Sequence, residues 1–339
     1  MKILKILKIL FQLLLCTLIA SSCKDGERLY KKSTILMDTV VTITVSSESK
    51  ENAESAIDSA FERIKEIEGL INFWSPRSEV SALNSAAGRE KVKVSPVTLD
   101  MVEKALYISR KTEGGFDATI GPIIRLYDFK KKTKPSDSSI KEKLTLIGFR
   151  NVFTDKNKST VYLGKKGMSF DTGGIAKGYA ADVAVEVLKR KGIKGGIVAV
   201  SGDIKTFGLK PDGLPWLVGI KNPRPKSKDD EIMATIELQD SAISTSGDYE
   251  RFFMENGRRY HHIIDPMTGI PASGCQSVSV ISKEGALSDG FSTGIFVMGP
   301  ERGMRLLREL GFDGIIIDTE GKIYVTEGIK DKVNWHKKP

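Results

Sequence analysis

The sequence predicts an α+β fold, a mixed α/β body in which helices pack on β-sheets. The chain has 339 residues, 40% of them hydrophobic and 28% charged, so it can bury a large core. Segments with the two-residue period of strands occur together with segments of helical period. The strands look antiparallel and the helices among them are long. Both features favour mixed sheets over a doubly wound parallel sheet.

The first half of the chain begins with a strand and two helices. The segment 30–45 is predicted to be extended, because Val41, Ile43 and Val45 alternate with threonines in a run rich in β-branched residues. Apolar residues recur at helical spacing over 52–72 and predict a helix. A second helix is expected over 99–111, with Thr98 as its N-cap. The charged, serine-rich stretch 130–143 is the most loop-like part and is a place where two lobes can separate.

The second half is richer in strands. Five segments have β character: 159–164, 196–208, 215–223, 231–249 and 277–282. The chain then ends with two helices and two strands, expected over 285–299, 300–310, 314–318 and 322–328.

The N-terminus has the composition of an export signal. Residues 1–22 carry three lysines, an apolar run and small residues. The run over 9–20 has about twelve residues, too short for a transmembrane helix of roughly twenty. The following ASSC ends at Cys23 and resembles the lipobox of bacterial lipoproteins, with Ala20 in place of the commoner leucine. We expect Cys23 to be lipidated; the alternative is ordinary signal cleavage that leaves Cys23 as a spare thiol.

Charge and cysteine content restrict the function classes. Removing the three signal lysines reduces the formal charge from +9 to +6, a modest excess that fits an anionic membrane or an acidic ligand nearby. No basic patch interleaved with aromatic residues favours nucleic acid. After loss of Cys16 and lipidation of Cys23, only Cys275 remains, which excludes a disulfide framework and a cysteine metal site.

The turn DTGGIAKGYAAD over 171–182 resembles a phosphate cradle. It matches neither GxxxxGK[ST] nor GxGxxG, so a P-loop and a Rossmann site are excluded. Its glycine pair precedes a helix N-terminus, which attracts anions. Lys177 lies in the first turn, where the helix dipole favours an acid, so its position suggests a ligand. The alternative is a structural turn that needs glycines for positive φ.

A second segment, SDGFSTGIFVMG over 288–299, suits a metal ion. Asp289 and Thr293 are separated by four residues and share one face of the expected helix. A carboxylate and a hydroxyl are the hard oxygen ligands that Mg²⁺ prefers while it keeps open positions for phosphate. The alternative is an acid near the helix N-terminus and a threonine bonded to its own backbone.

Histidines are candidates for proton transfer. Neighbours on an extended strand point to opposite faces, so at most one of His261 and His262 enters a given site. Beside the turn at Asp265, that histidine is placed for proton transfer near neutral pH, although a core or capping histidine is the default reading. Zinc is improbable because His336 is at the far tail and Cys275 is a single thiol.

Further turns combine glycine with an acid. TEGGFDATIGP over 112–122 has two glycines before Asp117, and its Phe116 can pack on a flat ring. SAISTSGDYERFF over 241–253 adds a turn of small residues. Six such turns together favour a large polar ligand that the backbone holds at many points.

Taken in order, eight motifs resemble those of the ApbE family, the FAD:protein FMN transferases. They are LMDT, FWSPRSEVSALN, GGFDATIGP, DTGGIAKGYAAD, VSGDI, STSGDY, HHIIDPMTGIP and SDGFSTGIFVMG, and the resemblance spans about Thr34 to Val325. It implies a two-lobed body with FAD in the cleft between lobes. It also implies a Mg²⁺-dependent enzyme of the bacterial cell envelope, facing the periplasm or the exterior, that moves FMN from FAD to a Thr or Ser hydroxyl of a membrane-associated flavoprotein subunit and releases AMP.

The resemblance assigns roles by position. It makes Asp289, Thr293 and the carbonyl of Gly174 the metal ligands, and His262 the proton-transfer residue. The FAD-contacting positions are Met37, Gly115, Phe116, Asp117, Asp171, Lys177 and Ile263. The implied division is a lipoprotein signal peptide over 1–22, an anchor linker over 23–33, the flavin transferase domain over 34–330 and a tail over 331–339.

Some features depart from the family pattern, and other activities stay open. Asp38 stands where glycine is usual, and Ser288 and Gly290 stand where alanines are common. On the same scaffold, water in place of the acceptor hydroxyl gives an FAD pyrophosphatase that releases FMN and AMP. A non-catalytic flavin-binding lipoprotein is the third reading. The presence of Asp289, Thr293 and His262 argues against it.

Overall fold

The computed structural model describes residues 26–336. The expected signal peptide, the expected lipidation site at Cys23 and the last three residues lie outside this range. Within the described range, no helix combines the length and the hydropathy needed to cross a bilayer.

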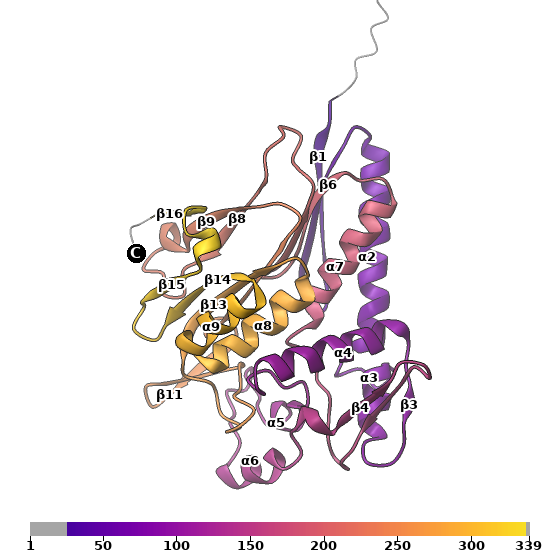
Figure 1. The fold of residues 1–339 in the computed structure, drawn as a ribbon, viewed down its shortest axis with the longest axis vertical. Helices are drawn as coiled ribbons and strands as arrows, with labels where there is room; N and C mark the ends of the chain where they lie inside the picture. Colours follow the sequence, from indigo (N-terminus) through magenta and orange to yellow (C-terminus); the bar gives the residue numbers. More distant parts are fainter. Residues whose placement is uncertain (1–25, 337–339) are drawn as a thin grey trace, which may run out of the picture.

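A large antiparallel sheet forms the body of the protein (Figure 1). Every neighbouring pair of strands in it is antiparallel, which confirms the predicted α+β class. In spatial order its strands are β1 (Arg28–Leu36), β2 (Thr39–Ser47), β6 (Gly195–Val200), β7 (Asp203–Phe207), β10 (Ala242–Gly247), β13 (Cys275–Ser282), β14 (Asp313–Asp318) and β15 (Ile323–Val325).

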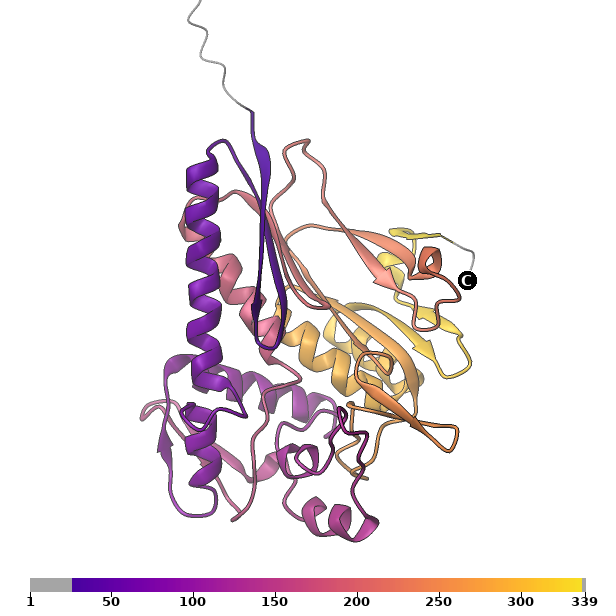
Figure 2. The same cartoon turned by 180° about the vertical axis from the view of Figure 1, so that it is seen from behind.

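Helices cover one face of this sheet and a small second sheet covers part of the other (Figures 1 and 2). The apolar stripe of α2 (Lys50–Ile71) packs on Val41, Ile43 and Val45 of β2. The second sheet packs on isoleucines of β7, β10 and β14. The helices are α2 (Lys50–Ile71), α7 (Ala176–Arg190), α8 (Gly285–Met298) and α9 (Pro300–Leu310), and the second sheet contains β16 (Val333–Trp335), β9 (Ile232–Leu238) and β8 (Trp216–Lys221).

A smaller lobe lies below the sheet (Figure 1). Its elements are α3 (Glu79–Ser85), β3 (Val92–Lys93), α4 (Pro96–Lys111), α5 (Gly121–Ile124), α6 (Asp137–Leu144), β4 (Val152–Asp155) and β5 (Thr160–Leu163). A ribbon of β11 (Phe252–Glu255) and β12 (Arg258–His261) packs against it through Phe253 and Phe129. Short 3₁₀ turns complete the chain at η1 (Phe149–Asn151), η2 (Lys228–Asp230) and η3 (Glu327–Ile329).

Two local predictions are corrected. The N-cap of α4 is Ser95 rather than Thr98, because the Ser95 hydroxyl accepts the Thr98 N–H at 3.3 Å and Pro96 opens the helix. The stretch 130–143 is not wholly a loop, since Ser136 caps helix α6 within it. The predicted helix over 52–72 is confirmed and begins at Lys50, one residue after the cap Ser49.

Candidate active site

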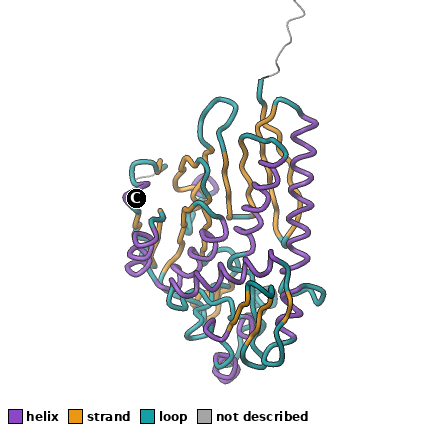
Figure 3. Tube along the Cα trace, turned by 45° about the vertical axis from the view of Figure 1, so that its right-hand side comes forward, coloured by secondary structure: helices purple, strands orange, loops and turns teal. Residues whose placement is uncertain are grey.

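A cavity of about 350 Å³ lies between the two lobes. Loops gather at the lower end of the large sheet, as the teal segments of Figure 3 show. The structure brings to its wall every site residue expected from the sequence except Met37 and the undescribed Cys23. These residues are Gly115, Phe116, Asp117, Asp171, Gly174, Lys177, His262, Ile263, Asp289 and Thr293.

Met37 lies in the turn between β1 and β2, two residues before the cavity-lining Thr39. It is partly buried and packs on the cores beneath the helices. Met37 and Asp38 have φ values of 54° and 55°. Asp38 therefore occupies the left-handed region in which glycine is most at ease and aspartate is tolerated.

The turn before α7 is built for close approach rather than for positive φ. Neither Gly173 nor Gly174 has a positive φ, so the structural alternative for this glycine pair is wrong. A Cβ on Gly174 would lie 3.0 Å from the Phe116 ring and 3.5 Å from the Thr293 hydroxyl oxygen. The Asp171 carboxylate accepts the Gly173 N–H at 2.7 Å. The glycines let this backbone approach both lobes.

Helices α7 and α8 cross at two glycines, and this contact positions the candidate metal ligands. A Cβ on Gly178 would lie 2.0 Å from the Gly285 carbonyl oxygen. At the same crossing the Gly178 N–H donates to the Asp289 carboxylate at 3.0 Å. The Asp182 carboxylate accepts the N–H of Gly285 at 2.7 Å and so fixes the start of α8.

Thr293 lies one turn after Asp289 and faces the cavity. Its hydroxyl is 3.1 Å from the Ser246 hydroxyl on β10. It does not bond its own helix backbone, and Asp289 does not cap the helix. The structural alternative predicted from the spacing does not describe this pair, since the Asp289 carboxylate accepts an N–H from α7 and the Thr293 hydroxyl contacts β10.

Lys177 is already paired with acids. Its ammonium group bonds the Asp203 carboxylate and lies 3.9 Å from the Asp289 carboxylate. Burial alone would lower the pKa of Lys177, but Asp203 and Asp289 raise it above its usual value. Burial, together with the charge of Asp203, raises the pKa of Asp289 to about 7. Asp203 was not expected as a site residue, although it lies in the VSGDI motif.

The donor set fits a hard divalent cation. Carboxylates outnumber cations on the cavity wall, where Asp117, Asp171, Asp203, Glu250 and Asp289 face only Lys177 and Arg251. Within residues 26–336 no cluster of three or more His, Cys, Asp or Glu side chains forms a metal cage. A cation at Asp289 and Thr293 would thus depend on one carboxylate, a hydroxyl and a carbonyl, which suits Mg²⁺ with open positions. It would also offset the repulsion between Asp289 and Asp203.

Only one of the two neighbouring histidines lines the cavity, as predicted from the alternation of side chains along an extended segment. His261 is buried, and its Nε2 lies 2.8 Å from the Ala272 carbonyl oxygen. His262 lines the cavity, and its Nδ1 is buried without a hydrogen-bond partner among the described residues. Burial and the charge of Arg251 lower the pKa of His262 to about 3. His262 is therefore a neutral imidazole near neutral pH.

Asp117 has a structural duty that the sequence did not reveal. Its carboxylate accepts the N–H and hydroxyl of Thr119 and the N–H of Phe149 at 2.9 Å. Burial raises the pKa of Asp117 despite these bonds. The side chain therefore holds the loop between Thr119 and Phe149 in place.

On the side of the smaller lobe, the cavity is lined by aromatic residues, namely Trp74, Phe116, Tyr127 and Phe129. Arg125 stacks on Phe73 with its guanidinium carbon 4.2 Å from the ring centre and also contacts Trp74 at 5.2 Å. The sequence reasoning missed Trp74 and Arg251 as site residues. Trp74 lies within the FWSPRSEVSALN motif, and that motif was the only signal for it.

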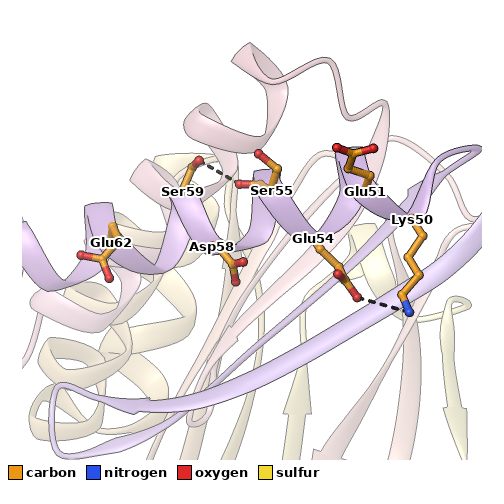
Figure 4. Close-up of a pocket in the computed structure, with 7 residues that line it drawn as sticks. All are labelled: Lys50, Glu51, Glu54, Ser55, Asp58, Ser59 and Glu62. Carbon is orange, nitrogen blue, oxygen red and sulfur yellow. Dashed lines mark hydrogen bonds and ion pairs between the residues drawn. The ribbon is translucent and has the colours of Figure 1, made fainter.

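A second hollow runs along the exposed face of α2 (Figure 4). It is lined only by successive turns of α2, whose charged and serine side chains point to solvent. No groups from other elements converge on it, so it does not resemble a binding site. The residues are Lys50, Glu51, Glu54, Ser55, Asp58, Ser59 and Glu62.

Comparisons with known proteins agree with this geometry. The model of the ApbE family matches residues 37–316. An FAD:protein FMN transferase from Treponema pallidum is 32% identical over 94% of this chain and 93% of its own length. An FAD:protein FMN transferase from Vibrio cholerae is 34% identical over 71% of this chain and 72% of its own length. The crystal structure of the ApbE protein from Thermotoga maritima superposes with a TM-score of 0.83 at 34% identity, covering 90% of this chain and 99% of that one. The structure of the flavin transferase ApbE from Vibrio cholerae superposes with a TM-score of 0.80 at 30% identity, and it covers the same shares of the two chains.

Proposed function

Because the chain belongs to the ApbE family, we propose that it is an FAD:protein FMN transferase that uses Mg²⁺. It moves the FMN moiety of FAD to a Thr or Ser hydroxyl of a target flavoprotein and releases AMP. The observation that carries this proposal is the convergence of Lys177, Asp289 and Thr293 with His262 on one cavity between the lobes.

The cavity wall suits a flavin dinucleotide. Aromatic rings on the smaller lobe can pack on a flat ring system, while Gly174 and Lys177 line the cavity at the N-terminus of α7, the positive end of the helix dipole, which attracts phosphate. The FAD contacts assigned by the family resemblance remain our proposal for Gly115, Phe116, Asp171, Lys177 and Ile263. For Met37, which lies outside the lining, the contact stays a prediction.

Asp289, Thr293 and the Gly174 carbonyl would hold the Mg²⁺. When bound, the ion supplies positive charge that neutralises the phosphate oxygens of the substrate. Phosphoryl transfer depends on alignment and charge neutralisation more than on covalent help from the protein. Lys177 contributes to this alignment indirectly. Its ion pairs with Asp203 and Asp289 hold the Asp289 carboxylate in position for the metal ion.

His262 is the group that accepts the acceptor's proton. Its neutral ring has an unpartnered Nδ1, so it can take a hydroxyl proton as that oxygen forms its bond to the FMN phosphorus. The bond from the FMN phosphorus to the bridging oxygen of the pyrophosphate breaks at the same time. AMP leaves with that oxygen and with the electron pair of the broken bond.

We further propose that the protein acts at the bacterial cell envelope. The signal over 1–22 and the ASSC sequence support a lipid on Cys23, and a membrane-associated flavoprotein subunit would then be the acceptor. The Cys23→Ser variant should lose incorporated palmitate and move from the membrane fraction to the soluble fraction. Unchanged labelling and fractionation would contradict the anchor.

The function is tested with FAD, Mg²⁺ and a candidate flavoprotein domain. We expect a covalently fluorescent acceptor with wild-type protein and none in EDTA. Thr293→Ser, which keeps the hydroxyl, should retain transfer, whereas Thr293→Val should lose it. Release of free FMN without labelled acceptor would identify an FAD pyrophosphatase, and unchanged FAD would identify a flavin-binding protein.

A further inference from the structure

Arg251 differs from the other charged groups on the cavity wall. Its guanidinium makes no hydrogen bond or ion pair within residues 26–336, although it lines the cavity together with Lys177 and His262. Lys177, the other cation of the lining, is already bonded to Asp203 and close to Asp289. The cavity therefore has a single cation that is free to meet an anionic ligand among its described residues.

The backbone of Arg251 is held while its side chain is left free. Its carbonyl accepts the His262 N–H at 3.1 Å, which fixes the arginine opposite the proposed proton acceptor. The acids just before it are bound elsewhere. Asp248 pairs with Arg224 at 2.8 Å, and Glu250 pairs with Lys221 at 3.1 Å. These pairs anchor the turn between β10 and β11 and leave no nearby acid to neutralise Arg251.

We propose that Arg251 binds the pyrophosphate bridge of the flavin dinucleotide and so makes the cavity select phosphate-bearing flavins over uncharged flavin. This inference rests on the proposed function and assigns a specificity role to a residue outside the metal site. A guanidinium presents several N–H donors in a planar fork that matches phosphate oxygens. In a cavity with excess carboxylate, an anionic substrate needs such a contact to offset repulsion.

The test compares two flavins that share the same ring. FAD and riboflavin are titrated into the purified full chain by flavin fluorescence, in EDTA so that no metal contributes. Riboflavin has no phosphate. Arg251→Gln should weaken FAD binding by about 10- to 100-fold, the range expected for a lost hydrogen bond to a charged group. Riboflavin affinity should stay within about twofold of wild type. The FAD affinity of Arg251→Lys should lie between those of wild type and Arg251→Gln, because lysine keeps the positive charge but lacks the planar set of N–H donors of a guanidinium.

Arg258→Gln is the matched control. Arg258 lies on the neighbouring strand β12, is exposed and does not line the cavity, so this variant should bind both flavins like wild type. FAD affinity unchanged in Arg251→Gln overturns the proposal. Equal weakening for FAD and riboflavin also overturns it, since the arginine would then shape the flavin pocket. Wild-type protein that does not bind FAD even when Mg²⁺ is supplied would instead overturn the proposed function itself.

Discussion

At the scale of single residues, the site depends on charges that are buried close together. Asp289 is 3% exposed and shares Lys177 with Asp203, which is 2% exposed. Two buried carboxylates around one ammonium leave an excess of negative charge. A bound cation would relieve this excess, so the arrangement that weakens the protein without metal is the one that would favour the Mg²⁺ we propose.

Asp289→Asn should therefore separate activity from stability. Loss of the carboxylate should lower the transfer rate by about 100-fold or more, because several kcal/mol of charge stabilisation disappear. Folded Asp289 holds its proton to about pH 7, against 3.8 as the ordinary value, so stability is lost as the pH rises through 7. In EDTA at pH 8 the variant should melt at a higher temperature than wild type.

The control for this prediction is Asp240→Asn, since Asp240 is an exposed acid near Lys189. That variant should change neither rate nor melting temperature measurably. An Asp289→Asn protein with full activity would refute the metal assignment. A variant that melts below wild type at pH 8 in EDTA would refute the electrostatic account of Asp289.

His262 gives a prediction with the opposite sign. In an unfolded chain a histidine takes up a proton below about pH 6.5, whereas folded His262 stays neutral to about pH 3. The unfolded state then binds more protons, so the free energy of unfolding falls as the pH drops from 6.5 toward 3. His262→Gln should show a flatter melting profile between pH 6.5 and 4 in the absence of FAD. Parallel profiles would contradict the neutral buried ring.

The same histidine should matter for the rate. His262→Ala should lower transfer by about 100-fold, within the usual range for a general base. Because the ring is neutral from pH 6 to 8, the loss should be similar across that range. If the variant transfers FMN at the wild-type rate from pH 6 to 8, the proton acceptor is another group.

At the scale of elements, glycines bring the two site helices together. Gly178→Ala would place a Cβ 2.0 Å from the Gly285 carbonyl oxygen and 2.8 Å from the Asp289 Cβ, so α7 and α8 must separate. We expect about 1–3 kcal/mol of lost stability in urea unfolding and a lower kcat/KM for FAD. Gly69→Ala on α2, where nothing lies within 4 Å, should instead stabilise by up to about 1 kcal/mol. Equal effects of the two changes would contradict the close crossing.

Elements with a strong period could be predicted, and those without one could not. Helix α2 shows its stripe because one face packs on the sheet. Helix α6 buries only Ile140, so its polar sequence resembles a loop and only the cap at Ser136 announces it. The β11–β12 ribbon is short and packs through isolated aromatic residues, which leave no alternating pattern to detect.

At the scale of the whole molecule, the cavity forms where segments far apart in sequence meet. The i, i+4 spacing of Asp289 and Thr293 could be recognised locally, and so could the glycines before Lys177. The pairing of Lys177 with Asp203 and the isolation of Arg251 could not, because both depend on how α7, the β6–β7 turn and the β10–β11 turn pack together. The order of motifs predicted the fold; the charge balance of the site required the structure.

We propose that this cavity transfers FMN from FAD to a protein hydroxyl. The most direct measurement incubates FAD, Mg²⁺ and an acceptor domain with the wild-type chain and quantifies AMP together with flavin covalently bound to the acceptor by mass spectrometry. We expect equal amounts of AMP and FMN-modified acceptor with the wild-type chain, and neither product with Asp289→Asn. AMP formed with free FMN and an unmodified acceptor would contradict it.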